Sequence, residues 1–401
     1  MPWAEAAYWR RPERRAPRPD ALRHLYVRQS RNEAIPDGEL KSAARDAVAD
    51  SIRRQLAAGI DIGNDGEQQR GAFFLDIRHR MNGFGGSWKR PARGDVLKYP
   101  SFQRVIEAQS GKREAVTAPN IAPPEAIGEI RYVEPGITPE CKVLRDALDA
   151  QGGFSDAFMT APAPGLIALA MRNAYYDTEQ AYLDALAAAL RAEYAKIAEA
   201  GFVLQIDSPD LGMERSRTYR DRPLSDFLDF ADRAIAAINT AIGDIPRERV
   251  RLHVCWGNAE GPHDEDVPLT DLIAVLRNAR VGAWVLPFAN PRHAHEYRYL
   301  DKLLTGERTI IAVDEFWKAL GDDAFRSFAQ DGLKTYRKRN AMMVFATQSP
   351  ADALKSDIAH SILEQVATKI MLPNPFGARR DYVEGFALSE AEYKLVREEL
   401  A

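Results

Sequence analysis

The sequence predicts an α/β protein with a parallel sheet, because buried apolar runs alternate with amphipathic helices along the chain. A helix expected over 178–200 is followed at once by FVLQID, a helix over 224–245 by RVRLHVCW, and a helix over 269–282 by AWVLPFA. Repeated helix-strand units of this length are typical of a (β/α) barrel, which is the architecture that we expect.

The first part of the chain shows the same alternation after an irregular start. Residues 1–33 are rich in Arg and Pro and lack a clear apolar period until Ala21, so we expect a solvated lead-in there. A helix is expected over 39–59, where Gly59 would end it. IDIGND follows and is typical of a short buried strand, which adds one more helix-strand unit.

Composition excludes several classes of protein. The 401 residues are 45% hydrophobic, enough for one large core or two smaller ones, and the net charge of −4 gives no general attraction to nucleic acid or an anionic membrane. No apolar run approaches the roughly 20 residues of a membrane span, and no secretory signal is recognisable. Cys141 and Cys255 give no disulfide framework. We therefore expect a cytoplasmic protein with neither a membrane span nor a nucleic-acid partner.

Polar residues follow the expected strands, at the end where the functional loops of a barrel converge. These candidate functional residues are Asp65, Glu67, Asp207, His253, Cys255, Asn290, Arg292, His293 and His295.

His253 and Cys255 form a recognisable pair among these candidates. One residue separates them, so on a strand their side chains leave the same face, about 6 to 7 Å apart along the chain. Imidazole with thiolate is a favoured zinc pairing, although a tetrahedral site needs at least a third protein ligand. From the residues alone, a buried structural pair and a metal site both stay open.

Five ordered motifs give the barrel a family resemblance. In chain order they are IDIGNDGEQQRGAFF, MNGFGGSWKR, GFVLQIDSPDLGM, HVCWGNAEGPHDEDVPLTDLI and ANPRHAHEYR. Over about 17–300 the chain resembles the cobalamin-independent methionine synthase family, above all its short single-barrel relatives, which include the coenzyme M transferases. The resemblance implies a TIM barrel, which we place at 34–303, and zinc-dependent transfer of a methyl or alkyl group to a small thiol.

The resemblance also implies roles for individual residues. His253 and Cys255 would be metal ligands, and the bound Zn²⁺ would hold the substrate thiol as a nucleophilic thiolate. Asp207 matches the Asp of the family's I-D-x-P motif and would be the catalytic and substrate-binding carboxylate. Asp65 and Glu67 would bind substrate at the same mouth. For Asp207, an exposed or helix-capping carboxylate is the alternative.

The family pattern is incomplete in this chain. Pro287 stands where a family Glu would supply a further zinc ligand, and no Cys follows Cys255 to serve as the last one. Glu260 and Glu296 are more distant candidates without support from spacing. The family's first strand is also unrecognisable, so we expect an incomplete (β/α)8 TIM barrel with a weakly held or absent Zn²⁺.

The C-terminal part has a strand pattern of its own, in TIIAVDEFW, AMMVFATQSP and ATKIMLPNP. Asp314 and Glu315 follow the first of these strands, and Gln348 follows the second. Nucleoside triphosphatases use such positions to hold Mg²⁺ and to sense the γ-phosphate. By itself, an acidic pair at the end of a strand is about as often a pair without any catalytic role as it is part of a nucleotide site.

Residues 309–400 resemble the C-terminal part of the type IV secretion (conjugal transfer) ATPases in DEFWKAL, KTYRKRNAMMVFATQSP, ILEQVATKIMLPNP and DYVEGFALSEAEYKLV. This implies a partial RecA-like α/β segment at 304–401. The phosphate-binding loop G-x-x-x-x-G-K-[ST] is missing, because the Gly111-Lys112 pair lacks both the first glycine and the hydroxyl residue. Asp314, Glu315 and Gln348 would be a vestigial nucleotide site, and ATP hydrolysis is not expected.

Three interpretations of function stay open. The first is a zinc-dependent thiol methyl- or alkyltransferase, impaired by missing ligands, whose partners are a small thiol and a methyl or alkyl donor. The second is a non-catalytic fusion that contacts secretion machinery through its C-terminal segment, with the helix over 389–399 and the edge strands as contacts. The third is a chimeric reading frame joined near Leu300. Bound zinc would separate the first two.

Overall fold

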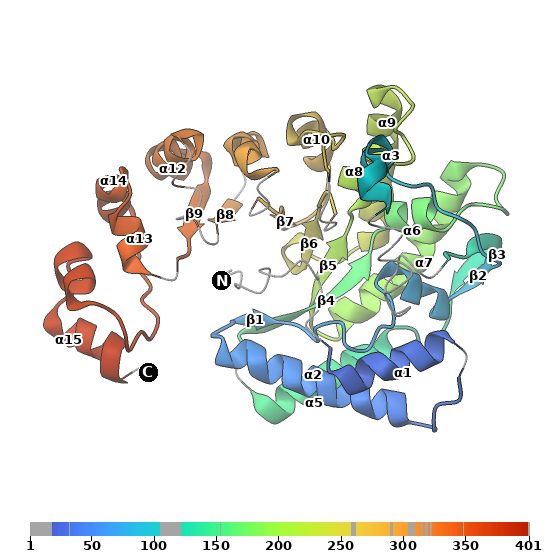
Figure 1. Ribbon diagram of the computed structural model, residues 1–401, viewed down its shortest axis with the longest axis horizontal. Helices are drawn as coiled ribbons and strands as arrows, with labels where there is room; N and C mark the ends of the chain where they lie inside the picture. Colours follow the sequence, from blue (N-terminus) through green and yellow to red (C-terminus); the bar gives the residue numbers. More distant parts are fainter. Residues whose placement is uncertain are drawn as a thin grey trace. The chain divides into compact units, whose positions relative to one another are not determined.

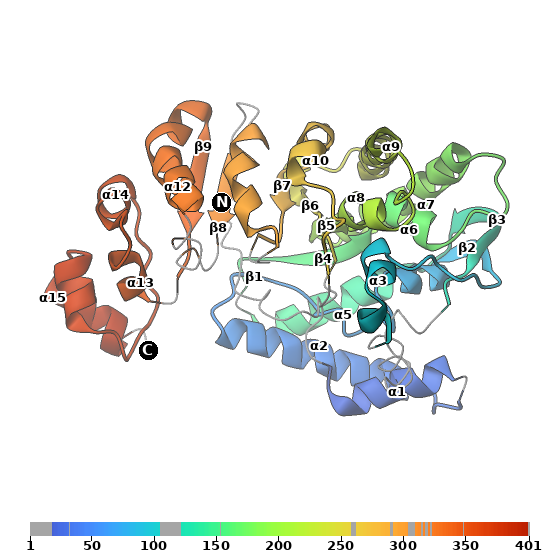
Figure 2. The ribbon, with the colours of Figure 1, turned by 45° about the horizontal axis from the view of Figure 1, so that its top comes forward.

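The structure is a computed structural model that divides into two compact units, Met1–Pro287 (unit 1) and Phe288–Ala401 (unit 2). It describes residues 18–31, 33–104, 122–152, 154–257, 262–288, 292–303, 309–313, 316, 320, 323–347 and 349–399 (Figures 1 and 2). The domain limits expected from the sequence, after residues 33 and 303, stay a prediction.

Unit 1 is built on a five-stranded parallel sheet with the strand order β1-β4-β5-β6-β7. The strands are β1 (Ile62–Gly63), β4 (Asp156–Pro162), β5 (Val203–Asp207), β6 (Val250–His253) and β7 (Ala283–Val285). The register places Pro162, Asp207, His253 and Val285 side by side across β4 to β7. The sheet is a parallel half-barrel, and the carboxyl ends of its strands share one edge.

Helices precede and follow the strands of the half-barrel. They are α1 (Asp20–Ser30), α2 (Glu39–Ala57), α5 (Thr138–Gln151), α6 (Pro164–Ala170), α7 (Glu179–Glu199), α9 (Leu224–Ile242) and α10 (Leu269–Leu276). In α9, Phe227, Phe230, Ala234 and Ile238 recur at helical spacing and are all buried, which makes this helix amphipathic. In Figures 1 and 2, α5, α7 and α10 lie outside the arc of strands.

A cap and a glycine determine where β5 begins. The Thr178 side chain accepts a hydrogen bond from the backbone N–H of Ala181 (3.1 Å) and so caps the start of α7. Gly201, with a φ of 81°, turns the chain from the end of α7 into β5. All residues of β5 are buried, so the strand holds Asp207 at a defined place at its carboxyl end.

A two-stranded ribbon and several short helices complete the description of unit 1. The ribbon pairs β2 (Met81–Gly85) with β3 (Glu125–Tyr132) in an antiparallel manner. The short helices are η2 (Phe74–His79), α3 (Gly94–Lys98), α8 (Asp210–Met213), η4 (Glu214–Ser216) and η5 (Arg247–Arg249). Gly212 of α8 packs on the backbone after β6, where an added Cβ would lie 2.5 Å from the carbonyl oxygen of Cys255.

Unit 2 contains a parallel pair of strands, β8 (Thr309–Val313) and β9 (Ala341–Phe345). Its helices are η6 (Ala294–Leu303), α12 (Asp323–Thr335), η7 (Tyr336–Arg339), α13 (Pro350–Leu354), α14 (Ala359–Gln365), η8 (Arg380–Gly385), α15 (Glu390–Lys394) and η9 (Leu395–Glu399). Tyr382, Tyr393 and Val396 form a small apolar cluster. Ser389 and Glu392 form a capping box at the start of α15.

Most expected elements are present. Helices α2, α7, α9 and α10 and strands β1, β5, β6, β7, β8 and β9 lie where the alternation predicts them. The mixed α/β class is confirmed, with a parallel half-barrel sheet, whereas β4 and the β2–β3 ribbon were not expected. In the part of the chain that the structure describes, no helix combines the length and the apolar character that a bilayer span requires.

Two expectations about local structure were wrong. Residues 20–30, assigned to an irregular lead-in, form α1, because Leu22 and Tyr26 share a face that packs against α2. ATKIMLPNP, expected as a third C-terminal strand, forms no strand in the structure, which describes all nine of its residues. Ile370 and Leu372 in that segment are exposed, so burial does not compensate for its two prolines, which cannot donate to a ladder.

Candidate functional site

Asp207 and His253 are paired neighbours at the carboxyl ends of β5 and β6. His253 Nδ1 lies 2.8 Å from Asp207 Oδ1, and the Gln205 amide donates to the same oxygen over 2.9 Å. Gln205 and Asp207 are two residues apart on β5, so their side chains leave the same face of the sheet. Asp207 is 2% exposed and His253 4% exposed, so the contact is shielded from water.

Cys255 extends this contact to a sulfur atom. It lies two residues beyond His253, is also buried, and is hydrogen-bonded to the His253 side chain. Burial lowers the pKa of His253, but Cys255 and Asp207 outweigh this effect and raise the pKa to about 9. We call Asp207, His253 and Cys255 the strand-end cluster. The structure thus brings together three of the residues that the sequence singled out.

A polar row lies next to the strand-end cluster on the same face of the sheet. Thr160, Gln205 and Arg251 are register neighbours across β4, β5 and β6. The Arg251 guanidinium carbon lies 3.7 Å from the centroid of the Phe158 ring. Barrel interiors are usually filled by branched apolar side chains. This row is polar instead, so it can form hydrogen bonds with polar groups next to it.

Asp65 and Glu67 lie in the loop after β1, where internal contacts hold them. Asp65 Oδ1 accepts a hydrogen bond from the backbone N–H of Glu67 (2.9 Å), which supports the positive φ of 51° at Glu67. Glu67 Oε1 accepts from the Thr160 hydroxyl (2.9 Å). Burial raises the pKa of Asp65, and Arg70 opposes that shift. Glu67 therefore reaches the polar row on β4, whereas Asp65 holds Glu67.

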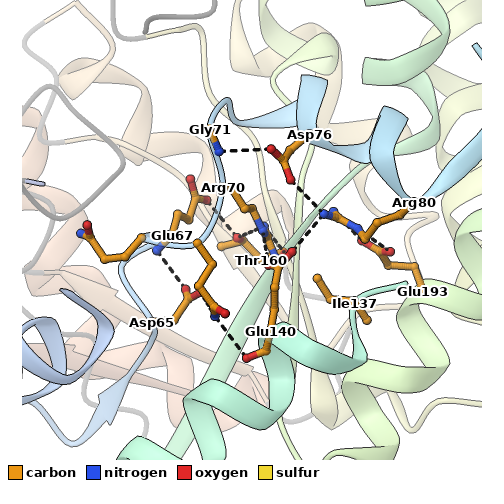
Figure 3. Close-up of polar contacts among 12 residues, drawn as sticks. Asp65, Glu67, Arg70, Gly71, Asp76, Arg80, Ile137, Glu140, Thr160 and Glu193 are labelled. Carbon is orange, nitrogen blue, oxygen red and sulfur yellow. Dashed lines mark hydrogen bonds and ion pairs between the residues drawn. The ribbon is translucent and has the colours of Figure 1, made fainter. Parts of the chain in front are cut away.

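Two buried arginines connect this loop to α5 and α7 (Figure 3). Arg70 donates to Glu140 Oε2 (2.7 Å) and to the carbonyl and hydroxyl oxygens of Thr160 (both 2.9 Å). Arg80 donates to both carboxylate oxygens of Glu193 (2.9 to 3.1 Å) and to Glu140 Oε1 (3.1 Å). We call Arg70, Arg80, Glu140 and Glu193 the arginine network.

The charges of the arginine network support one another. Burial raises the pKa of Glu140, but Arg70 and Arg80 outweigh it and hold the pKa below its usual range. Burial lowers the pKa of Arg80, but Glu193 and Glu140 outweigh it and raise the pKa above its usual value. Arg70, Arg80 and Glu140 therefore stay charged at neutral pH, and the network binds the loop, α5 and α7 together.

A further carboxyl, that of Asp210, is buried in α8 just beyond β5. Its Oδ1 accepts from the Ser208 hydroxyl (2.8 Å), whereas Oδ2 has no hydrogen-bond partner among the described residues. An added Cβ at Gly165 would lie 2.3 Å from Oδ2, so glycine is required beside it. Burial raises the pKa of Asp210 to about 7, and the carboxyl is therefore half protonated near neutral pH.

The donor atoms around the strand-end cluster do not complete a zinc site. His253 and Cys255 are suitable ligands and lie together, but a tetrahedral site needs a third protein donor. Within the described ranges, no group of three or more His, Cys, Asp or Glu side chains could hold a metal ion. Asp207 Oδ1 belongs to the same cluster, but it already contacts His253 and Gln205. These residues therefore do not fit Zn²⁺ as a complete set.

The remaining candidates lie in unit 2 or outside the described residues. The structure does not describe Gly111, Lys112, Glu260, Asn290, Asp314, Glu315 and Gln348. Arg292, His293 and His295 belong to unit 2, whereas the strand-end cluster belongs to unit 1. His293 Nδ1 lies 2.7 Å from Glu296 Oε2, so these two residues contact each other.

Sequence reasoning missed Gln205, Thr160 and the arginine network. Gln205 could have been found, because a residue two positions before Asp207 on a strand must share its face. The contact between Arg70 and Glu140 spans 70 positions. No local spacing indicates such a pair, so only the folded chain shows it.

The fold of the half-barrel places it in a known structural class. A solved structure of a B12-independent methionine synthase from Shewanella sp. W3-18-1, in complex with selenomethionine, is similar with a TM-score of 0.52 and 17% identity. The likeness covers 78% of this chain and 82% of that chain. At this identity the comparison shows a shared fold alone.

Sequence comparison finds relatives of a different kind. The type IV secretion system protein virB4 of Bartonella quintana (strain Toulouse) is 59% identical over 104 residues, which are 26% of this chain and 13% of that protein. The type IV secretion system protein PtlC of Bordetella pertussis is 42% identical over 98 residues, 24% of this chain and 12% of that protein. The chain thus spans about one eighth of the length of these curated relatives. No family model matches it.

Both resemblances expected from the sequence are confirmed. The structure has the fold of a B12-independent methionine synthase, and a segment of about 100 residues is similar to virB4-type proteins. That length is close to the 309–400 segment for which the motifs predicted the second resemblance. The chain therefore combines a methionine synthase-like fold with a segment that is similar in sequence to virB4-type proteins.

Proposed function

We propose that unit 1 is a methyl- or alkyltransferase domain for a small thiol, built as an incomplete (β/α)8 barrel and impaired in its metal site. One observation carries this proposal: Asp207, His253 and Cys255 form a connected, buried cluster at the carboxyl ends of adjacent parallel strands. Active sites of (β/α) barrels lie at that end of the strands. The likeness to a B12-independent methionine synthase supports the same class.

Asp207 would bind an amino or other polar group of the substrate. Its carboxylate is buried and is oriented by Gln205 and His253, so little reorganisation would accompany binding. Glu67 would approach the substrate from the loop after β1, since it already contacts Thr160 on β4. Asp65, which the sequence predicts to bind substrate as well, would act by holding Glu67.

The metal site would be the weak part of this domain. His253 and Cys255 would be the protein ligands, and two ligands hold Zn²⁺ less tightly than the three or four of established sites. We therefore expect a weakly held ion and slow transfer. The two free cysteines, Cys141 and Cys255, are consistent with a reducing environment, so a cytoplasmic location is part of the proposal.

Binding of thiols tests the proposal directly. Calorimetric titration of the full chain with homocysteine and with 2-mercaptoethanesulfonate should give a Kd of about 1 mM or tighter for at least one of them. Asp207→Asn should weaken that binding by about tenfold or more, because the substrate loses a charged partner. Asp184→Asn, which changes an exposed carboxylate of α7, is the matched control and should bind like the wild type. The proposal fails if neither thiol binds, or if Asp207→Asn binds as well as the wild type.

The similarity to virB4 favours a second function, for unit 2. We propose that unit 2 is a partial RecA-like segment that contacts secretion machinery through α15 and η9, without hydrolysing ATP. The 59% identity to a secretion-system protein supports this proposal. Equilibrium dialysis with labelled ATP should show no saturable binding, and a Kd of about 1 to 100 µM would overturn the view that its nucleotide site is vestigial.

Contact with secretion machinery needs a separate test. Surface plasmon resonance should show that the full chain binds a purified virB4-type protein, and Glu390→Lys on the exposed face of α15 should weaken the contact. Absence of binding would favour a chimeric reading frame. Sequencing the genomic locus across the codon for Leu300 would then show whether one open reading frame joins the two parts.

A further inference from the structure

One segment of unit 1 crosses the carboxyl ends of three neighbouring strands. It begins after β2, where the Trp88 indole N–H donates to the carbonyl oxygen of Ala170 at the end of α6, the helix that follows β4 (3.1 Å). It then contacts the chain after β5 and finally the chain after β6. We call residues 88–98 the strap; its last turn is α3, which lies beside α8 in Figures 1 and 2.

Arg90 anchors the strap to the end of β5. Its guanidinium is paired with the carboxylate of Glu214, the first residue of η4, which is 1% exposed. Burial raises the pKa of Glu214, but Arg90 and Arg217 outweigh it and hold the pKa below its usual range. A buried carboxylate that depends on Arg90 for its charge fixes the position of this part of the strap.

Arg93 anchors the strap to the end of β6. It donates to the carbonyl oxygen of Trp256, the residue that follows Cys255 (3.4 Å), and to Asp266 Oδ1 (3.2 Å). Asp266 Oδ2 in turn lies 2.7 Å from His263 Nδ1. Arg93 is itself buried. This anchor therefore acts on the stretch of backbone that carries Cys255.

The strap packs closely on the chain that it crosses. An added Cβ at Gly94 would lie 2.1 Å from Glu265 Oε2, and one at Gly257 would lie 3.3 Å from Arg93 Nη1. The three residues of the strand-end cluster are only 2 to 4% exposed. A small molecule therefore needs a movement of the surrounding chain to reach them.

We propose that the strap closes the strand-end cluster and must lift to admit a small-molecule ligand, with Arg90 and Arg93 as the positioning residues that hold it down. The nature of the ligand rests on the proposed transferase function, but the closure does not. Both anchors contain ion pairs and hydrogen bonds, which can be broken locally while the sheet stays folded.

Chemical modification of Cys255 tests the closure without any assay of activity. In a Cys141→Ser background, Cys255 is the only thiol. Its rate of modification would be measured with a small reagent, methyl methanethiosulfonate, and with a bulky one, a maleimide coupled to polyethylene glycol. We expect Arg93→Ala to raise the rate for the bulky reagent by about tenfold or more, and the rate for the small reagent by less. Arg90→Ala should act in the same direction.

Comparing two reagents separates access from thiol chemistry. A change in the thiol itself would accelerate both reagents equally, whereas a lifted strap favours the bulky one. Arg249→Ala is the matched control, because it removes a half-buried ion pair with Asp156 at the opposite end of the sheet, and it should leave both rates unchanged. Arg93→Lys should restore most of the closure.

Hydrogen exchange provides a second readout. In Arg93→Ala, backbone amides of residues 88–98 should exchange faster while those of β5 keep their protection. If that variant does not fold, Asp266→Asn removes the same pairing with a smaller change. The proposal is wrong if folded variants react like the wild type, if both reagents accelerate equally, or if β5 loses protection together with the strap. Thiol binding can fail without affecting any of these outcomes.

Discussion

The strand-end cluster and the arginine network are both buried, polar and charged, yet their arrangement differs in a way that separates chemistry from structure. In the arginine network Glu140 of α5 pairs with both arginines, and Arg80 also pairs with Glu193 of α7, so cations and carboxylates alternate across the fold. In the strand-end cluster one carboxylate, one imidazole and one thiol follow each other along adjacent strand ends. Residue type alone does not distinguish the two groups; their placement in the half-barrel does.

Breaking the arginine network should have the largest effect on stability. Arg80→Ala leaves Glu193, which is fully buried, without its cation, so the free energy of unfolding should fall by about 3 to 5 kcal/mol. Urea unfolding followed by circular dichroism measures this loss. Lys142→Ala, which removes an exposed pair with Asp146 on α5, should cost only about 0.5 kcal/mol or less. A similarly small loss of the free energy of unfolding for Arg80→Ala would show that the arginine network does not stabilise the fold.

Asp210 sharpens the comparison, because it is a buried carboxyl near the strand-end cluster whose hydrogen bond comes from the Ser208 hydroxyl. Its folded-state pKa of about 7 lies above its ordinary value of 3.8. Its contribution to stability is therefore fully present below about pH 4 and is lost as the pH rises through 7. Asp210→Asn removes this dependence on pH. The free energy of unfolding of the variant, measured relative to that of the wild type, should therefore be roughly 2 to 4 kcal/mol higher at about pH 8 than at about pH 4.

Urea unfolding of the wild type and Asp210→Asn at several pH values between about 4 and 8 would measure this difference. The Asn amide keeps the acceptor for Ser208 but cannot ionise. A difference in stability that does not change with pH would show that Asp210 ionises as easily in the folded chain as in the unfolded one.

Thr160 connects Glu67 to Arg70 of the arginine network, and its loss should have a smaller effect. Thr160→Val removes the hydroxyl that donates to Glu67 and accepts from Arg70, at nearly constant volume. We expect a loss of about 1 to 3 kcal/mol, since both partners are buried. Thr240→Val on the exposed face of α9 is the matched control and should change stability by less than about 0.5 kcal/mol. If both variants lost the same free energy of unfolding, the hydrogen bonds of Thr160 to Glu67 and Arg70 would contribute nothing to stability.

Local periodicity was enough to predict most of the half-barrel and the strand-end cluster. The helices and strands from 178 to 285 follow from apolar spacing, and Asp207, His253 and Cys255 follow from their places at strand ends. Each of these features depends on residues within one element or directly after it. Their mutual contact then follows from the parallel register, in which Asp207 pairs with His253.

Features that depend on distant residues could not be predicted. The arginine network joins residues 60 to 113 positions apart, and the strap joins residues 82 to 173 positions apart. The prediction for ATKIMLPNP was wrong because it used local pattern alone. The segment has the apolar pattern of a strand, but a strand also needs a neighbouring strand with which to pair.

Titration with Zn²⁺ in competition with a chromophoric chelator tests the central proposal most directly, namely that the strand-end cluster is an incomplete metal site that binds Zn²⁺ only weakly. The wild type should bind one ion with a Kd weaker than about 1 µM, and Cys255→Ala should bind it about tenfold more weakly still. A Kd in the nanomolar range or below would show that further ligands complete the site, and equal binding by Cys255→Ala would show that the cluster is not the site.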